Sequence, residues 1–170
     1  MLILFIRHAE AKNDKLTSFG LKQCELLSNQ TEDYEFFKIY SSPAYRCKKT
    51  AEYYNENKHL KLEIDERLNE RETLENSPQN EFEKLWYDNY MNPKFSSKQP
   101  EGCKELLDRV YDFLDEKISF HKQKNENFVV VSHSGIFYAF MSYFNREKTG
   151  DINWYKIGNA SKVYFEIKNK

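Results

Sequence analysis

The chain has 170 residues, of which 39% are hydrophobic and 16% aromatic, and its 26 basic and 27 acidic side chains give a net charge of −1. This length suggests one domain with a sizeable core, and so small a net charge provides no bulk positive field for nucleic acid or an anionic membrane. Three cysteines without metal-site spacing, and apolar runs far shorter than the about 20 residues of a membrane span, indicate a cytoplasmic protein.

The chain opens with a continuous apolar run, Leu2–Ile6, which ends abruptly in Arg7 and His8. Such a run is typical of a strand that is buried on both faces in a parallel sheet. Ligands of open α/β sheets bind beyond the carboxyl ends of the strands, so Arg7 and His8 would face a crevice. The alternative is that they are only a polar end to the strand.

Helices and strands alternate along the rest of the chain. Apolar spacing predicts a helix at 17–28, a strand at 36–40, a helix beginning at 41–43, a strand at 60–64, a helix beginning at 77–78, a loop at 94–100, a helix at 101–121, a strand at 128–131, a helix at 136–144, and a terminal hairpin or strand pair at 154–157 and 163–167. Thr17 or Ser18 would cap the first helix, and Pro43 would lie in the first turn of the second. This order predicts a three-layer α/β/α sandwich with a mostly parallel sheet, in a single domain at 1–170.

Two of the predicted strands share one pattern, an apolar run followed by a histidine. Leu2–Ile6 leads to His8, and Phe128–Ser132 leads to His133. If the two strands are neighbours in a parallel sheet, the two imidazoles lie in one crevice. Chance placement of both half-motifs is the alternative.

Arg7, Arg46, His8 and His133 would together form a compact cationic site in a nearly neutral protein. The rigid fork of an arginine matches phosphate oxygens, and two arginines with two histidines suit a phosphate dianion better than a carboxylate. A metal site is the rival interpretation of the histidines. Cationic neighbours would repel a divalent ion, and no clustered cysteine or carboxylate ligands accompany the histidines, so we expect neither a metal nor a cofactor.

Six stretches of the sequence match one family in its own order. They are Arg7-His8-Ala9-Glu10-Ala11, Leu16-Thr17 with Gly20, Ser41-Ser42-Pro43 through Arg46 to Thr50-Ala51, Arg67-Leu68-Asn69-Glu70-Arg71, Pro100-Glu101-Gly102, and Val131-Ser132-His133-Ser134-Gly135. On these motifs the chain resembles, over almost its whole length, the histidine phosphatase superfamily, the phosphoglycerate mutase-like proteins.

The resemblance implies a role for each matching residue. His8 would be the nucleophile that takes up phosphate, Arg7, Arg46 and His133 would form the phosphate pocket, and Glu70 would donate a proton to the leaving group. The chemistry agrees, because the nearby arginines disfavour protonation of the attacking imidazole, and a protonated His133 with the arginines would stabilise the transferring group.

Glu70 lies in a charged run, where a solvated surface glutamate is the plain alternative. Its flanking arginines would favour the ionised carboxyl, and bound phosphate would raise its pKa. The match to the family also departs at Asp14, where many relatives have an asparagine that contacts phosphate. We expect Asn13 to take that role after a one-residue shift, and we expect Thr17 and Ser134 among the substrate contacts.

The segment 78–100 lies where relatives place a cover over the site. Its residues Tyr87 and Phe95 are candidates for the substrate pocket, whereas the i, i+4 spacing of Phe82, Trp86 and Tyr90 favours packing against the core.

The sequence therefore predicts a metal-independent phosphatase that acts on a small phosphorylated metabolite through a phosphohistidine at His8. Three alternatives stay open: a phosphoglycerate-type mutase, a protein-phosphohistidine phosphatase, and a non-catalytic module that binds phosphorylated ligands. Mutases of the family are longer than this chain, small protein-phosphohistidine phosphatases tend to lack the cover segment, and intact candidate catalytic residues argue against a degenerate binding module.

Overall fold

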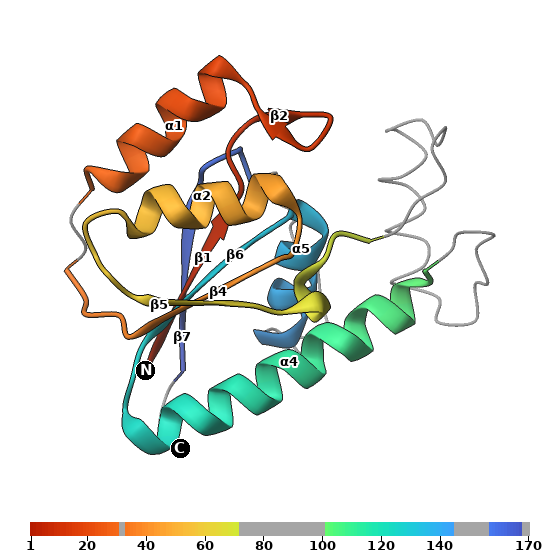
Figure 1. Cartoon of the computed structure of the whole chain (residues 1–170). Coiled ribbons are helices and arrows are strands. Elements are labelled where there is room, and N and C mark those ends of the chain that lie inside the picture. The colour runs from red at the N-terminus through yellow and green to blue at the C-terminus, as the bar shows by residue number, and fades with distance from the viewer. Residues whose placement is uncertain (31–32, 72–100, 145–156, 168–170) are drawn as a thin grey trace.

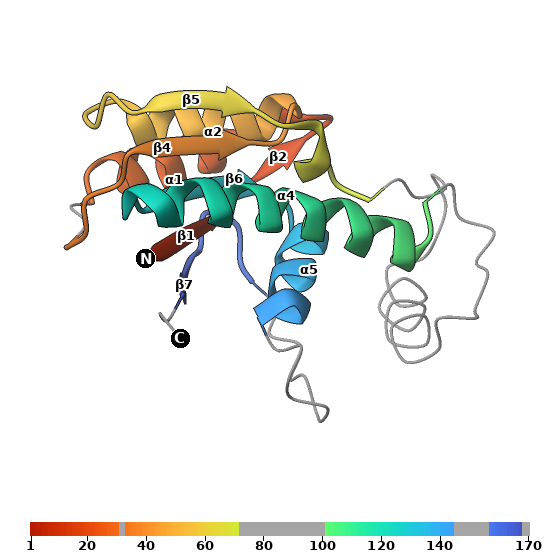
Figure 2. The same ribbon diagram turned by 90° about the horizontal axis from the view of Figure 1, so that it is seen from below.

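The computed structural model describes residues 1–30, 33–71, 101–144 and 157–167, and in these ranges a five-stranded sheet lies between two layers of helices (Figure 1, Figure 2). The strands are β1 (Leu2–Arg7), β4 (Lys38–Ser41), β5 (Lys61–Ile64), β6 (Phe128–Ser132) and β7 (Lys162–Glu166). Their order is β5-β4-β6-β1-β7, and only the β1–β7 pair is antiparallel. The predicted three-layer α/β architecture with a mostly parallel sheet is confirmed.

Two pairs of helices cover the two faces of the sheet, α1 with α2 on one face and α4 with α5 on the other. The helices are α1 (Ser18–Ser28), α2 (Tyr45–Asn55), α4 (Cys103–Lys124) and α5 (Ser134–Phe144), with a 3-10 turn, η1 (Glu66–Leu68). Successive side chains of a strand point to opposite faces. Leu4 and Ile6 of β1 therefore pack with α1 and α2, whereas Ile3 and Phe5 pack with α4 and α5.

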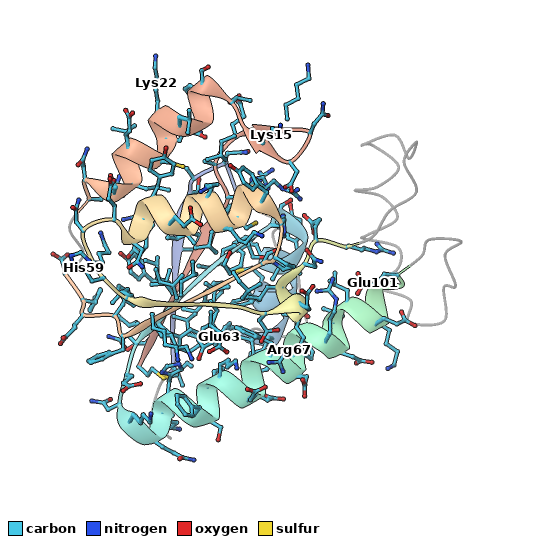
Figure 3. All side chains as sticks on the ribbon, in the orientation of Figure 1. Lys15, Lys22, His59, Glu63, Arg67 and Glu101 are labelled. Carbon is cyan, nitrogen blue, oxygen red and sulfur yellow. The ribbon has the colours of Figure 1, made fainter. Side chains whose placement is uncertain are left out.

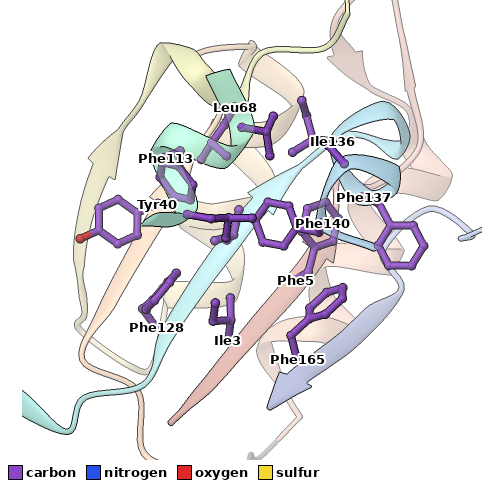
Figure 4. Close-up of a cluster of buried hydrophobic side chains, with 14 of the residues drawn as sticks. Ile3, Phe5, Tyr40, Leu68, Phe113, Phe128, Ile136, Phe137, Phe140 and Phe165 are labelled. Atoms are coloured by element: carbon purple, nitrogen blue, oxygen red, sulfur yellow. The ribbon is translucent and has the colours of Figure 1, made fainter. Parts of the chain in front are cut away.

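Aromatic side chains fill the core on the side of α4 and α5 (Figure 4). The ring of Phe5 lies 5.5 Å from that of Phe137 and 5.0 Å from that of Phe140, and Phe140 lies 5.7 Å from Phe165 of β7. Because large aromatic rings bury the most apolar area per residue, this cluster fixes α5 on the sheet. The beginning of α5 is thereby held at the carboxyl end of β6.

β1 and β6 are adjacent and parallel, as the shared strand-histidine pattern predicted. Their register pairs Arg7 with Ser132, so His8 and His133 each follow the last paired residue of their strand.

The sequence misplaced the start of α2 and missed a small hairpin. α2 begins at Tyr45, so the prediction of Pro43 in its first turn was wrong. The reason is that Ser41 completes β4 and the Ser42 N–H donates to Val131 O at 3.1 Å, which keeps the chain extended beyond the strand. The missed hairpin joins β2 (Ala11–Lys12) to β3 (Lys15–Leu16).

The other predicted elements differ at their ends or lie beyond the described ranges. α4 ends at Lys124 rather than at His121. Asn125, in the left-handed conformation, caps its C-terminus. The predicted strand at 163–167 is β7, and its described partner is β1. The helix beginning at 77–78, the loop at 94–100, the cover segment and the strand at 154–157, apart from Ile157, lie outside the described residues. Within the described ranges, each helix is too short or too polar to cross a membrane.

Candidate active site

The carboxyl ends of β1, β4 and β6 bring the two histidines together. The backbone N–H of His8 donates to Ser132 O at 2.9 Å, and the N–H of Ala160 reaches the carbonyls of Arg7 and His8 at 3.1 and 3.2 Å. The imidazole rings of His8 and His133 lie 5.2 Å apart between centroids. Ala160, just before β7, and Ser132 of β6 therefore hold the same stretch of backbone, Arg7 and His8.

One ring nitrogen of His8 is hydrogen-bonded to the backbone, and the other faces Arg46 in the site. Nδ1 lies 2.8 Å from Ala9 O, so Nδ1 carries the hydrogen, and Nε2 accepts a hydrogen bond from Arg46 Nε at 3.2 Å. Burial, followed by the charges of Arg46 and Arg7, lowers the pKa of His8 to about 4, against the opposing effect of the Ala9 carbonyl. The imidazole is therefore neutral at physiological pH, with its lone pair on Nε2.

Arg46 contacts three groups with the three nitrogens of its guanidinium. Nε donates to His8 Nε2 at 3.2 Å, Nη2 donates to His133 Nδ1 at 3.1 Å, and Nη1 donates to Asp14 Oδ1 at 2.7 Å. The guanidinium thus lies between both imidazoles, where it can meet the oxygens of a phosphoryl group.

Arg7 lies beside the same histidine at the end of β1. Its Nη1 donates to Ile157 O, while its Nε is buried and has no hydrogen-bond partner among the described residues. Burial lowers the pKa of Arg7, and the nearby Glu70 carboxyl opposes that effect. A buried donor of this kind is a favourable contact for an anion.

His133 is completely buried, and its surroundings make it neutral. Nδ1 accepts from Arg46, so the hydrogen lies on Nε2 and is donated to Ser42 Oγ at 2.8 Å, and the Ser42 hydroxyl donates to Asn69 Oδ1 at 3.2 Å. Burial, and then the charge of Arg46, lower the pKa of His133 to about 2. Without a bound anion His133 is therefore neutral, because burial and the neighbouring cations oppose a further positive charge, and its protonation beside a phosphoryl group stays a prediction.

Glu70 turns into the site instead of pointing to solvent. Its Oε1 accepts from the Arg71 N–H at 3.0 Å, and its Oε2 accepts from the Gly135 N–H at 3.3 Å. Burial raises the pKa of the carboxyl above its ordinary value, although those two N–H groups oppose the effect. A Cβ atom on Gly135 would lie only 2.2 Å from Oε1, so the approach requires a glycine at this position. The alternative of a solvated surface glutamate does not hold, because Glu70 lies against Gly135 and its carboxyl accepts from two backbone N–H groups.

A network of ion pairs fixes the segment that carries Glu70 against α4. Its pairs are Arg67 with Asp65, Asp112 and Glu116, and Arg109 with Glu101. Figure 3 shows Arg67 and Glu101 along this side of α4. Two further bonds secure the segment: Arg71 Nε donates to Glu101 O, and the Ser132 hydroxyl donates to Leu68 O at 2.7 Å.

The other predicted substrate contacts have varied surroundings, and their roles stay predictions. The Thr17 hydroxyl accepts from the Gly20 N–H at 3.0 Å, which confirms it as the cap of α1, and donates to Glu10 at 2.8 Å. Ser134 begins α5 and is half-buried, and Asn13 is exposed at the tip of the β2–β3 hairpin. Tyr87 and Phe95 lie outside the described residues.

Sequence reasoning missed two residues that organise the site, Asp14 and Thr50. Asp14 pairs with Arg46. Thr50 accepts from the Ala9 N–H at 3.0 Å and donates to Arg46 O at 2.7 Å, so it joins the two segments that carry His8 and Arg46. The Asn13-Asp14 pair is the available signal for the hairpin, because such residues favour two-residue turns.

A groove on the side of the β2–β3 hairpin is separate from the two imidazoles. A groove of about 500 Å³ borders the hairpin, α1 and α2, and its lining, which includes Lys15, Leu16, Leu21 and Tyr45, contains neither imidazole. Among the described residues, no group of three or more His, Cys, Asp or Glu side chains could hold a metal ion. Metal independence stays a prediction.

Comparison with known proteins identifies the family of this chain. Residues 3–170 match the model of the histidine phosphatase superfamily (branch 1). A probable phosphatase of Schizosaccharomyces pombe (strain 972 / ATCC 24843) is 29% identical over 156 residues, which cover 81% of this chain and 54% of that protein. The chain thus spans about half the length of the curated relative that it matches.

Solved structures show the same fold. The alpha-ribazole phosphatase from Shigella flexneri has a TM-score of 0.77 at 19% identity, over 99% of this chain and 91% of that chain. The phosphoserine phosphatase from Entamoeba histolytica, in complex with 3-phosphoglyceric acid, has a TM-score of 0.75 at 20% identity, over 97% and 90% of the two chains.

The match to the family model covers nearly the whole sequence, and three of the motifs that carry the resemblance, those with His8, Arg46 and His133, meet beyond the carboxyl ends of β1, β4 and β6. The chain belongs to the histidine phosphatase superfamily, branch 1.

Proposed function

We propose that this protein is a metal-independent phosphatase that hydrolyses a small phosphomonoester through a phosphohistidine on His8. The observation that carries the proposal is the state of His8: a neutral imidazole whose Nδ1–H is bonded to Ala9 O and whose Nε2 lone pair faces the Arg46 guanidinium. A nucleophilic nitrogen beside fixed phosphate-binding donors is the arrangement that phosphoryl transfer requires.

In the first step, His8 Nε2 attacks the phosphorus of the bound ester. The bond between phosphorus and the ester oxygen breaks, and that oxygen takes the proton of Glu70, whose pKa is raised by burial. Arg46 and Arg7 donate to the phosphoryl oxygens, and their positive charges stabilise the transition state. The Nδ1–H of His8 remains on Ala9 O, which stabilises the positive ring that forms.

In the second step, the ionised Glu70 takes a proton from water, and the water oxygen attacks phosphorus. The phosphorus–nitrogen bond breaks, inorganic phosphate leaves, and His8 and Glu70 return to their starting states. A phosphate dianion beside His133 opposes the effect of the cations on that ring and raises its pKa, so His133 can then donate to a phosphate oxygen.

The names of the structural neighbours support a small substrate. Two of them are an alpha-ribazole phosphatase and a phosphoserine phosphatase, and both names denote small phosphorylated metabolites. The buried position of His133 and the partly buried position of His8 agree with a substrate that enters the site as a small group.

The test is to trap the phosphoenzyme. The protein is incubated briefly with a radiolabelled phosphomonoester and quenched in alkali, because a phosphohistidine survives base and is lost in acid. We expect label on His8, turnover of p-nitrophenyl phosphate that persists after exhaustive chelation, and loss of both label and turnover in His8→Ala. His59→Asn is the matched control, since His59 is exposed and asparagine tolerates its positive φ of 54°.

Three results would contradict the proposal in different ways. Turnover that survives in His8→Ala would exclude His8 as the nucleophile. Activity that chelation removes and zinc or magnesium restores would favour metal chemistry. Transfer of label to a second hydroxyl of the substrate, rather than to water, would identify a mutase. A screen of phosphorylated metabolites with free-phosphate detection would then identify the substrate.

A further inference from the structure

The β2–β3 hairpin presents one carboxylate to the start of α2. Its two central residues, Asn13 and Asp14, have positive φ angles of 50° and 61°. Ala11 pairs with Leu16 and Lys12 pairs with Lys15, so the loop contains only these two residues and is a primed turn that suits asparagine and aspartate. This tight turn leaves the backbone of Asp14 little freedom.

Asp14 supplies the cap that α2 lacks in its own sequence. Ala44 occupies the N-cap position, and its side chain makes no cap hydrogen bond. The Asp14 carboxylate instead accepts from the Tyr45 N–H at 2.9 Å and from the Arg46 N–H at 3.3 Å. The first N–H groups of a helix have no partner within it, and an aspartate is a favourable acceptor for them.

The same carboxylate also pairs with the Arg46 side chain, at 2.7 Å between Oδ1 and Nη1. Although burial raises the pKa of Asp14, the hydrogen bonds from the Tyr45 and Arg46 backbone and from the Arg46 guanidinium outweigh it, so the pKa is lowered and the group is ionised. The remaining nitrogens of Arg46 donate to His8 Nε2 and His133 Nδ1. Arg46 thus makes three side-chain contacts, and of these the contact with Asp14 is an ion pair.

We propose that Asp14 is a positioning residue: its carboxylate holds the Arg46 guanidinium against His8 and His133, in the place where the phosphoryl group is received. The expected effect of Asp14 on the rate rests on the proposed function. Its expected effect on the hydrogen bonds of the two imidazoles does not, because those bonds exist without substrate. The simpler alternative is that Asp14 only caps α2.

Substitution by asparagine separates the two roles. Asparagine caps helices about as well as aspartate does, so Asp14→Asn should keep α2 and the melting temperature. Its amide carries no charge, and its single oxygen replaces two carboxylate oxygens that serve three donors. The hold on the guanidinium should therefore be lost while the cap remains.

The experiment compares wild type, Asp14→Asn and Asp14→Ala in the full chain. We expect Asp14→Asn to melt like wild type but to hydrolyse p-nitrophenyl phosphate with kcat lowered about tenfold, less than the 10²–10³-fold cost of removing a stabilising donor outright. Asp14→Ala should lose both melting temperature and kcat. Glu52→Gln is the control for charge, because Glu52 pairs with Lys49 on the exposed side of α2.

A second readout does not depend on activity. Nitrogen NMR of the imidazole rings reports the two atoms that accept from Arg46, His8 Nε2 and His133 Nδ1. In Asp14→Asn both resonances should move toward those of a nitrogen without a donor.

Each outcome decides between the two roles. If Asp14→Asn matches wild type in kcat and in the imidazole spectrum, Asp14 is a cap alone and the proposal is overturned. If the wild-type protein shows no turnover, the proposed function fails, and the NMR comparison still supports or overturns the positioning role. In an Arg46→Gln background, Asp14→Asn should leave the imidazole spectrum unchanged, and a further change there would also contradict it.

Discussion

In the proposed mechanism the Glu70 carboxyl is protonated when it serves the leaving alkoxide and ionised when it accepts a proton from water. Burial raises its pKa, whereas the N–H groups of Arg71 and Gly135 oppose the rise and keep the ionised form accessible. A group poised between two protonation states in this way is suited to act in both steps of a phosphoenzyme cycle.

Glu70→Gln should show a loss that depends on the leaving group. An alkyl phosphate releases a basic alkoxide, so kcat/KM should fall roughly 10²–10⁴-fold, whereas an activated aryl phosphate should lose much less. Wild-type activity on the alkyl ester should rise as His8 loses its proton near its pKa of about 4 and fall as pH passes the raised pKa of Glu70. Steady-state pH profiles of both enzymes measure this, and the variant should lack the alkaline fall.

Gly135→Ala provides an independent form of the same test. The added Cβ would lie 2.2 Å from Glu70 Oε1 and must displace the carboxyl. The variant should therefore reproduce the leaving-group dependence of Glu70→Gln with vanadate affinity largely retained. Equal losses on alkyl and aryl esters would mean that Glu70 is structural and that another acid, with Glu72 the next candidate, must be sought.

At the scale of elements, a threonine of α2 connects this helix to the backbone that follows β1. Thr50 accepts from the Ala9 N–H and donates to Arg46 O, so one hydroxyl relates the backbone after His8 to the backbone of Arg46. Ala9 and Thr50 are both fully buried, so neither group has water as a substitute partner.

Thr50→Val should lower both stability and activity. The shape is kept, but the buried Ala9 N–H loses its acceptor, which costs about 1–3 kcal/mol of unfolding free energy. Activity should fall as well, because the spacing of His8 and Arg46 is no longer fixed. Denaturant unfolding and turnover of p-nitrophenyl phosphate measure the two effects. Thr50→Ser keeps the hydroxyl and should retain most of both, and a serine variant as impaired as the valine variant would refute this explanation.

The sequence predicted the elements whose signals are local. The apolar runs of β1 and β6 identify buried strands, and the histidine after each one places the site at the carboxyl ends. The start of α2 was misplaced because proline after two serines also suits an extended link, which the bond from Ser42 to Val131 stabilises here.

The parts of the site that could not be predicted depend on residues distant in sequence. Asp14 meets Arg46 across a separation of 32 residues, through a turn that only the folded hairpin presents. The Glu70 carboxyl accepts from the Gly135 N–H across a separation of 65 residues. The neutral state of His133 likewise depends on the position of Arg46 in space. Residue types indicate the chemistry here, whereas burial and charge state follow only from packing.

At the scale of the whole molecule, the buried histidines couple stability to pH. Burial lowers the pKa of His8 to about 4 and that of His133 to about 2, and it also lowers the pKa of His121, which lies between Tyr40 and Glu126. The unfolded chain takes up these protons near pH 6.5, earlier than the folded protein does. Stability should therefore be complete above pH 6.5 and decrease as pH falls toward the lowered values.

Between pH 7 and pH 5 the unfolding free energy should fall by on the order of 1–2 kcal/mol for each of His8 and His133. Denaturant unfolding in buffers without phosphate measures the change, since a bound anion would stabilise the folded state. A His8→Gln and His133→Gln double variant should have a flatter profile. A wild-type profile without a fall over this range would show that the two rings are not held neutral by the fold.

The position of β1 in the sheet has a consequence for the synthesis of the protein. β1 precedes the other described elements in the chain, yet its sheet neighbours are β6, whose Phe128 pairs with Ile3, and β7, whose Glu166 pairs with Leu2. At about 5–20 residues per second, a ribosome takes several seconds or more to supply these partners. During that interval the apolar strand stays in the nascent chain with both edges unpaired, and the turn that carries Arg7 and His8 cannot form. Folding of the site is therefore a late event, and a chain that ends after α4 would lack both strands that complete it.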